Sequence, residues 1–428
     1  MEHSKQLLFI CCVLPQSLEK SAHMLTLREM VTLGWNVTVL TVQQQSGVTE
    51  VVNEEWQGVR LLRVPCQSCI TLKSQSRLKR LLSIQSFPDR YASGIDKLLA
   101  HALQLHVEQS FDIVLSLYHP ISSHSVAQKF SHQTDCPWIA LTKDYYSWPK
   151  SLVQSWRKKI VNPIKRRFEK KLYQDAHAIL STNNQMSDYL QQLAPHLSVD
   201  TLRHCYDETN NQNKKEQLKK EHKQFRLVSI GLTTKEDAKY LLHLFSIVKE
   251  LSEEGFVNAE QLRLRFIGHR GKIVRQCAEQ TGCQSFVDIL PPVSHAKAMS
   301  ELANATCLFL RQFDWGSRRR LADYIGARKP ILAYPEYSEI MSNDVLKQYG
   351  AAEIASDQTG LKKIVLKFYQ QYFSEGELSL PLNEELVNSY TSSSRAKELD
   401  RFIGNIIKLK ITQKQKSVSA TKEPVDAS

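Results

Sequence analysis

Residues 7–42 read LLFICCVLPQSLEKSAHMLTLREMVTLGWNVTVLTV, and this stretch decides the fold class. Its first part, Leu7–Leu14, is a continuous apolar run, which is typical of a strand buried on both faces of a parallel sheet. Apolar residues then recur near helical spacing over residues 21–33, and Gly34 stands where a left-handed residue would end the helix. The run Asn36–Val42 is again apolar and β-branched. The stretch therefore predicts a βαβ unit.

The same alternation of strand and helix patterns continues along the chain. A first series of strands is expected at residues 59–64, 112–117, 138–142, 177–182 and 200–205. A second series is expected at residues 226–231, 262–268, 285–290, 307–311, 330–335 and 351–355. Strands that alternate with helices indicate parallel α/β sheets, so we predict an α/β chain of two Rossmann-like, doubly wound parallel-sheet domains.

The length of 428 residues also favours two or three domains, at ~150 residues per domain. A polar run that begins after Asp207 separates the two series of strands. The expected segments are an N-terminal domain (1–207), a basic polar linker (208–224), a C-terminal domain (225–374), C-terminal helices (375–410) and a disordered tail (411–428).

The composition excludes several classes of protein. Hydrophobic residues make up 42% and charged residues 23%, as in ordinary folded proteins and unlike disordered or fibrous ones. We expect no transmembrane helix, because no apolar stretch approaches the ~18 residues that a bilayer requires. The nine cysteines are odd in number and scattered, which favours a reducing cytoplasm. Cys66 and Cys69 have the spacing of a metal knuckle, but no second pair follows, so no metal site is expected.

The net charge is +12, from 56 Lys and Arg against 44 Asp and Glu, which suits an anionic partner such as a membrane surface or a phosphorylated substrate. No nucleic-acid-binding motif accompanies the charge, so nucleic acid is not expected. Solvated helix faces and linkers are the alternative interpretation. The excess lies in three runs: Lys73, Arg77, Lys79 and Arg80; Arg157, Lys158, Lys159, Lys165, Arg166, Arg167, Lys170 and Lys171; and Lys214, Lys215, Lys219, Lys220 and Lys223.

Ligands of open parallel sheets bind beyond the carboxyl ends of the strands, so residues just after each strand are candidates for a site. His119, in LYHPISSH, could act as a general base or bind a sugar or phosphate, and a capping or packing role is the alternative. The segment KDYYSW places Asp144 beside Tyr145, Tyr146 and Trp148. Aromatic faces and a carboxylate suit a sugar acceptor, and they equally suit packing between domains.

The second domain offers glycines and cations at the same kind of position. Gly231 and Gly268 end two strands and would let backbone approach a ligand. Lys235 and Arg270 follow them at helix starts, where unpaired amide hydrogens favour anions. The glycine spacing matches neither a Walker nor a dinucleotide-binding fingerprint.

The most informative stretch is WGSRRRLADYIGARKPILAYP, residues 315–335. Arg320 could bind phosphate oxygens bidentately, and Asp323, followed by Tyr324, could hold sugar or ribose hydroxyls. A basic helix in which Asp323 pairs with a neighbouring Arg is the alternative.

These residues resemble a known family. The chain is similar to GT-B glycosyltransferases, above all to the family 4 (group 1) retaining enzymes that build bacterial surface polysaccharides. RLADYIGARKPILAYP resembles the family's C-terminal motif, residues 292–310 resemble the helix and strand before it, KDYYSW resembles the acceptor-cleft segment, and residues 390–403 resemble the terminal helix. The resemblance implies two domains that face a cleft and a C-terminal helix that crosses back.

The sequence departs from the family pattern at four places. Trp315 stands where many members have the first of two acids, and the glycine-rich loop is replaced by PQSLEKSA at residues 15–22. The segment before the linker reads HCYD, and Lys235 lacks the Arg that commonly accompanies it. These departures keep two alternatives open, which are a non-catalytic GT-B scaffold and a sugar-nucleotide epimerase.

The resemblance implies a hexosyltransferase that moves a sugar from a nucleotide-diphosphate sugar to a lipid-linked or polysaccharide acceptor of a cell-surface glycan. No metal-binding acid pair is visible in the sequence, so we expect metal independence. Lys235, Arg270 and Arg320 would stabilise the leaving diphosphate and Asp323 would hold donor hydroxyls, with no further cofactor. His119 and Asp144 would face the acceptor. The basic runs around Arg77 and from Arg157 to Lys171 would dock the first domain on the inner face of the plasma membrane.

Overall fold

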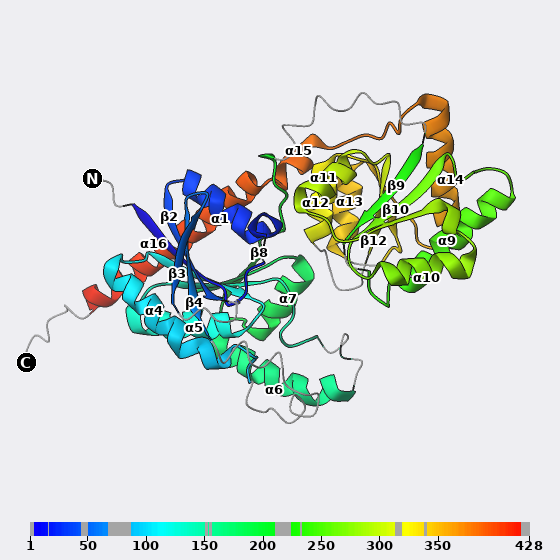
Figure 1. The fold of residues 1–428 in the computed structure, drawn as a ribbon. Helices are drawn as coiled ribbons and strands as arrows, with labels where there is room; N and C mark the ends of the chain where they lie inside the picture. The colour runs from blue at the N-terminus through cyan, green and yellow to red at the C-terminus, as the bar shows by residue number, and fades with distance from the viewer. Residues whose placement is uncertain are drawn as a thin grey trace, which may run out of the picture. The chain divides into compact units, whose positions relative to one another are not determined.

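The chain forms two α/β units (Figure 1). The first unit comprises residues 1–203 and 396–428, and the second comprises residues 204–395, so the boundary falls slightly before the expected residue 207. The structure is a computed structural model. It describes residues 4–15, 17–43, 50–66, 87–149, 153, 156–209, 224–231, 233–312, 319–337 and 340–420.

The first unit is built on an eight-stranded sheet with the order β3-β4-β2-β1-β5-β6-β7-β8. All neighbouring strands are parallel except β3 and β4, which are antiparallel. The order reverses between β1 and β5. The strands are β1 (Lys5–Ile10), β2 (Trp35–Gln43), β3 (Val52–Trp56), β4 (Val59–Pro65), β5 (Ile113–Tyr118), β6 (Trp138–Thr142), β7 (Ala178–Ser181) and β8 (Ser198–Thr201).

Helices cover both faces of this sheet, and each face has its own apolar core. The expected helix over residues 21–33 is present: the Ser21 side chain caps it by accepting a hydrogen bond from Met24 N, and Gly34 follows it with a φ of 86°. The helices are α1 (Ala22–Thr32), α4 (Ile95–Glu108), α5 (Ser122–Thr134), α6 (Trp156–Tyr173), α7 (Asn184–Leu193) and α16 (Ser392–Ala420), of which α16 belongs to the first unit from Ala396 onward.

The second unit is built on a six-stranded sheet with the order β11-β10-β9-β12-β13-β14, in which all pairs are parallel. The order reverses between β9 and β12. The strands are β9 (Phe225–Ile230), β10 (Leu262–Ile267), β11 (Val287–Leu290), β12 (Cys307–Arg311), β13 (Ile331–Tyr334) and β14 (Ala352–Ile354). The helices are α9 (Ala238–Glu253), α10 (Gly271–Thr281), α11 (His295–Ala303), α12 (Arg319–Ala327), α13 (Met341–Tyr349), α14 (Gln358–Glu375) and α15 (Glu384–Ser389).

The predicted α/β class with two doubly wound sheets is confirmed, and three local predictions are corrected. The antiparallel strand β3 was missed, because Val52–Trp56 carries three exposed polar residues and has no apolar run. The strand expected at 200–205 is β8, which lies at 198–201. The tail expected to be disordered from residue 411 continues α16 to Ala420.

Several expected features fall outside the described residues. These are the basic runs at 73–80 and 214–223, most of the linker, the tail at 421–428, Trp315 and Cys69. Cys66 is disulfide-bonded, whereas the expected reducing cytoplasm would favour a free thiol. Among the described residues, none of the helices combines the length and the apolar character that crossing a bilayer requires.

The C-terminal helix α16 completes the core of the first unit. Ile403 is fully buried against the sheet, and Asp400 accepts a hydrogen bond from Trp35 Nε1 at 2.8 Å. The helix α16, which is far from β1 and β2 in sequence, thus packs in the same apolar core as these two strands.

We predict that Ile403→Ala lowers the free energy of unfolding of the first unit by about 2–5 kcal/mol, because it leaves a cavity in a closed core. The matched control is Ile411→Ala on the same helix, where the side chain is 52% exposed and a change within about 0.5 kcal/mol is expected. Urea unfolding followed by circular dichroism measures both. Equal effects of the two substitutions would show that α16 is not part of the core.

Candidate functional site

The glycines that end β9 and β10 lie against each other in the second unit. Gly231 and Gly268 have φ values of 105° and 141°, which favour glycine. A Cβ on Gly268 would collide with the carbonyl oxygen of Gly231, and a Cβ on Gly231 would lie 2.6 Å from Arg320 Nη2. The structure therefore brings together three residues that the sequence singled out, at the strand ends where the order of the sheet reverses.

Arg320 reaches this point from the first turn of α12 and is 9% exposed. Asp323 lies one turn further along the helix, and its Oδ1 is 3.9 Å from Arg319 Nε. Burial raises the pKa of Asp323 to about 6, although Arg319 and Arg320 act in the opposite direction. The pairing that the sequence left as an alternative is thus present, and it lies beside the guanidinium that meets Gly231.

A buried ion pair that the sequence analysis missed braces the same strand ends. Arg311 ends β12, and its Nη1 lies 3.0 Å from Asp237 Oδ2, with the two side chains 1% and 0% exposed. Asp237 Oδ2 also accepts a hydrogen bond from Thr234 N at 2.6 Å. The signal in the sequence was an arginine that ends an apolar strand, since a charge at such a position needs a partner.

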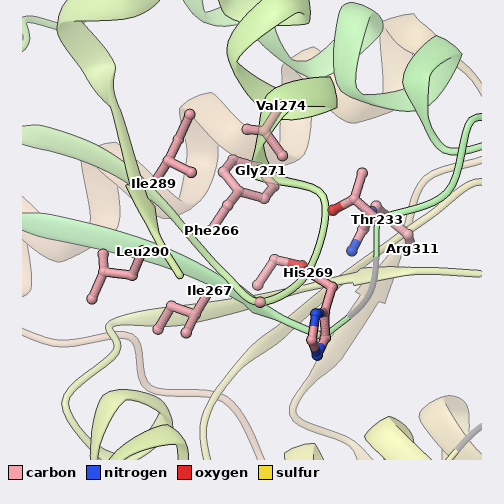
Figure 2. Close-up of a pocket in the computed structure, with 12 residues that line it drawn as sticks. Thr233, Phe266, Ile267, His269, Gly271, Val274, Ile289, Leu290 and Arg311 are labelled. Atoms are coloured by element: carbon pink, nitrogen blue, oxygen red, sulfur yellow. The ribbon is translucent and has the colours of Figure 1, made fainter. Parts of the chain in front are cut away.

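A small cavity lies at the ends of β9 and β10 (Figure 2). Gly231, Thr233, Gly268, His269 and Arg311 contribute to its lining, and Thr233 N donates a hydrogen bond to His269 O at 3.2 Å. Its volume is about 10 Å³, which is room for about one water molecule. The cavity is therefore too small to hold a ligand of the size of a nucleotide.

Lys235 and Arg270 are exposed on the same side of the sheet. Arg270 immediately precedes α10 with a φ of 64°, so its side chain stands at the amino end of that helix. Hydrogen bonds from its own N–H and from Thr234 lower the pKa of Glu236, and Arg270 and Lys235 lower it further. Both cations therefore lie near one exposed carboxylate, that of Glu236.

Tyr324 has a different role from the predicted donor contact. Its side chain is fully buried, and its hydroxyl accepts a hydrogen bond from Ile230 N at 3.0 Å and donates one to Phe309 O at 3.3 Å. The tyrosine thus ties β9 to β12 at the point where the strand order reverses. Its position in the motif is explained by this bracing.

In the first unit, His119 and Asp144 follow the neighbouring strands β5 and β6, and both are exposed. Partial loss of hydration lowers the pKa of His119, while Asp144 and Asp89 act to raise it. Asp89 also accepts hydrogen bonds from Ser122 N at 2.8 Å and from Ser122 Oγ at 2.7 Å. The structure brings His119 and Asp144 close enough to interact electrostatically and adds Asp89, which sequence reasoning missed.

The two tyrosines expected on the acceptor side lie inside the first unit. Tyr145 is 7% and Tyr146 is 3% exposed, and Trp148 is half-buried. Tyr145 packs against Trp148 and Tyr189 with ring centroids 5.6 Å and 5.5 Å apart. Tyr146 donates a hydrogen bond to Pro88 O at 3.3 Å. Packing within one unit therefore accounts for the tyrosines, and Lys143, Asp144 and Trp148 are the members of KDYYSW that retain exposed surface.

A buried carboxyl holds this segment against α6. Glu169 is 2% exposed and accepts hydrogen bonds from Ser147 N, at 3.2 Å, and from Ser147 Oγ. Ser147 Oγ also lies 2.6 Å from the hydroxyl of Tyr189. Burial raises the pKa of Glu169 to about 7. The sequence gives no signal that Glu169, an acid within a basic helical run, faces inward.

Comparisons with known proteins agree with this architecture. Residues 22–198 match the family model described as glycosyl transferase 4-like domain. The matched residues lie within the first unit. Among curated proteins, no sequence matches the chain significantly.

Several solved structures share the fold over nearly their whole length. Sucrose-phosphate synthase from Thermosynechococcus elongatus is 11% identical, with 98% of this chain and 100% of that chain covered and a TM-score of 0.60. α,α-Trehalose 6-phosphate synthase from Burkholderia multivorans is 9% identical, with 99% of this chain and 100% of that chain covered and a TM-score of 0.61. The E. coli trehalose-6-phosphate protein bound with UDP-2-fluoro glucose is 7% identical, with 94% of this chain and 99% of that chain covered and a TM-score of 0.63. These likenesses confirm the predicted GT-B fold.

Glu169 predicts a specific dependence of stability on pH. Its pKa is about 7 in the folded chain and near 4.5 when unfolded, so the folded state binds the extra proton between these values. The contribution of this group to the free energy of unfolding is therefore fully present below about pH 4.5. It decreases by about 3 kcal/mol as the pH rises to about 7. Glu169→Gln should remove this loss, because an amide does not titrate.

The free energy of unfolding of wild type and of Glu169→Gln is measured by urea unfolding from pH 4.5 to pH 8. The readout is the difference between the two free energies at each pH. Glu55→Gln, at an exposed position in the same unit, is the control and should follow wild type. A constant difference between wild type and Glu169→Gln across the range would contradict the assignment.

Proposed function

We propose that the chain is a glycosyltransferase that transfers a sugar from a nucleotide-diphosphate sugar to a lipid-linked or polysaccharide acceptor. The observation that carries the proposal is the guanidinium of Arg320 against the backbone of Gly231, at the point where the strand order reverses. Ligands of doubly wound sheets bind at this point. The glycosyl transferase 4-like match and a fold neighbour bound with UDP-2-fluoro glucose support the same substrate class.

The second unit would bind the donor. In the transfer, the bond between the anomeric carbon and the diphosphate oxygen breaks, and negative charge grows on the departing diphosphate. Arg320, Lys235 and Arg270 would stabilise that charge from fixed positions, which is the largest contribution expected of such a site. These side chains would serve in place of a metal ion, and metal independence is part of the proposal.

Asp323 would hold hydroxyl groups of the donor. Its Oδ1 accepts no hydrogen bond from the part of the chain that the structure describes, and it lies beside Arg319 and Arg320. An ionised carboxylate accepts hydrogen bonds only, which suits sugar or ribose hydroxyls. The group would therefore fix the sugar relative to the diphosphate.

The first unit would bind the acceptor. The new bond forms between the anomeric carbon and an acceptor oxygen, whose proton must leave. His119 has a lowered pKa, so its ring is neutral near pH 7 and can accept a proton, and Asp144 acts to stabilise the charged ring. Retention of configuration, a hexose as the transferred sugar and a role in cell-surface glycan synthesis at the inner face of the plasma membrane complete the proposal.

The first test is thermal unfolding of the full chain with UDP, GDP, CMP, ADP and dTDP and with their sugar conjugates. A nucleotide at ~100 times its dissociation constant should stabilise the protein by about 2.7 kcal/mol. We expect one nucleotide to do so. Arg320→Met should lower the affinity for that nucleotide by about tenfold or more, because a charge-assisted hydrogen bond is lost.

The matched control is Lys363→Met, which removes one positive charge from the exposed surface of α14 and should leave the affinity unchanged. Circular dichroism checks that both variants are folded. If no nucleotide stabilises the wild type, the proposal is wrong and a non-catalytic GT-B scaffold is favoured.

A second prediction concerns the pH dependence of donor affinity. With a pKa of about 6, Asp323 loses its charge as the pH falls, so affinity for the nucleotide sugar should decrease below about pH 6. Asp323→Asn should bind weakly at every pH. Calorimetry with the sugar conjugate measures this, because its phosphates do not titrate in this range. An unchanged affinity from pH 5 to pH 8 in wild type would exclude the role given to Asp323.

A further inference from the structure

Helix α6 has one face packed into the first unit and an apolar stripe on the opposite face. The buried face carries Glu169 and Leu172, at 2% and 3% exposed. Trp156, Ile160 and Ile164 follow one another at four-residue spacing, so they lie along one side of the helix. Their exposed fractions are 67%, 62% and 57%. Large apolar side chains are thus aligned toward solvent, where they add nothing to the core.

This stripe differs from the rest of the described surface. Single exposed apolar residues are normal in folded proteins, and Val107 on α4 is an example at 88% exposed. On α6, Val161 adds a fourth exposed apolar residue within nine positions, and no other described stretch of that length has more than two. Phe87, which is 46% exposed, packs on Phe168 of α6 at 5.1 Å between ring centroids and extends the apolar surface.

Positive charge borders the stripe. The helix carries eight Lys and Arg and one acid, Glu169, which faces inward. Lys159, Arg167, Lys170 and Lys171 are exposed, and no described acid lies within ion-pair distance of any of them. An apolar stripe with basic flanks on a helix of this kind matches an anionic lipid surface in both polarity and charge.

The helix is fixed to the domain that presents it. Asn162 accepts a hydrogen bond from Trp148 N at 2.7 Å and donates one to Trp148 O at 2.9 Å. The Lys165 ammonium lies 4.8 Å from the ring centroid of Tyr146. Together with Glu169, these contacts join the inner face of α6 to the acceptor-side segment. A surface that engages the outer face would therefore lie next to that segment.

We infer that the outer face of α6 docks the first unit on an anionic membrane surface, with the apolar stripe in the headgroup boundary and the lysines and arginines on lipid phosphates. The helix lies in the plane of the interface and does not span the bilayer. This inference rests on the proposed lipid-linked acceptor for its purpose, since docking would bring such an acceptor to the segment beside α6. It does not depend on the donor site.

The experiment is cosedimentation of the full chain with phosphatidylcholine vesicles that contain or lack phosphatidylglycerol. We expect binding to the anionic vesicles only, and weaker binding at high salt because the lysines and arginines are screened. Ile164→Glu should weaken binding by about tenfold or more, because a charge replaces an apolar group that enters the interface. Val107→Glu is the matched control: it also replaces an exposed aliphatic residue of the first unit with an acid, and it should bind as wild type does.

Three results would overturn the inference: no binding of wild type to anionic vesicles, equal losses in Ile164→Glu and Val107→Glu, or a wild-type dimer that Ile164→Glu converts to a monomer without vesicle binding. The last result would mean that a second copy of the chain covers the face. Nucleotide stabilisation is measured on the same samples. Vesicle binding without any nucleotide effect would refute the proposed function alone, and the converse would refute the docking face alone.

Discussion

The buried ion pair between Asp237 and Arg311 is the constraint on which the second unit depends. Two charges with 0% and 1% exposed side chains lose nearly all their hydration, and only close approach and further hydrogen bonds can offset that cost. Asp237 Oδ2 provides two such contacts, one with Arg311 Nη1 and one with Thr234 N. The turn after β9 is thereby fixed across the end of β12, and the turn carries Lys235. The position of an exposed cation thus follows from the pairing of buried charges.

The two units use the same topology for different chemistry. Where the strand order reverses in the second unit, the side chains are cationic and the backbone is crowded, as at Gly231 and Arg320. At the equivalent point of the first unit, Cys12 N donates a hydrogen bond to Ser123 Oγ at 3.0 Å, and His119 stands nearby at the end of β5. A cationic site suits a diphosphate, and a neutral imidazole suits a hydroxyl that must lose a proton. The proposed division of roles between donor and acceptor rests on these two settings.

The periodic parts of the fold could be predicted from sequence, and the direction of individual side chains could not. Fully buried strands such as β6 and β12 are nearly continuous apolar runs, so the apolar pattern alone gave their positions. The strand β3 lies at an edge and is polar, which removes that signal. Strand ends also predicted the places of Gly231 and Gly268, because parallel strands put their carboxyl ends at one edge.

Side-chain roles required the tertiary structure for a physical reason. Tyr324 and Tyr146 look suited to a ligand because each has a ring and a hydroxyl, yet the same groups can fill a core and satisfy buried backbone. Which of these occurs depends on neighbours distant in sequence, such as Ile230 for Tyr324 and Pro88 for Tyr146. Arg311 and Asp237 were missed for the same reason, since they are 74 residues apart in sequence and become partners only in the folded sheet.

Helix α6 shows how one segment can serve the core and the surface with opposite requirements. Its inner face buries an acid whose pKa is raised to about 7, and a buried acid costs stability unless it is protonated or well bonded. Ser147 provides those bonds, and the helix is thereby tied to the segment beside Asp144. Its outer face exposes Ile160 and Ile164, which gain nothing from contact with water. Covering such a face would remove apolar surface from water, and the surrounding positive charge is the reason why we infer an anionic surface as its partner.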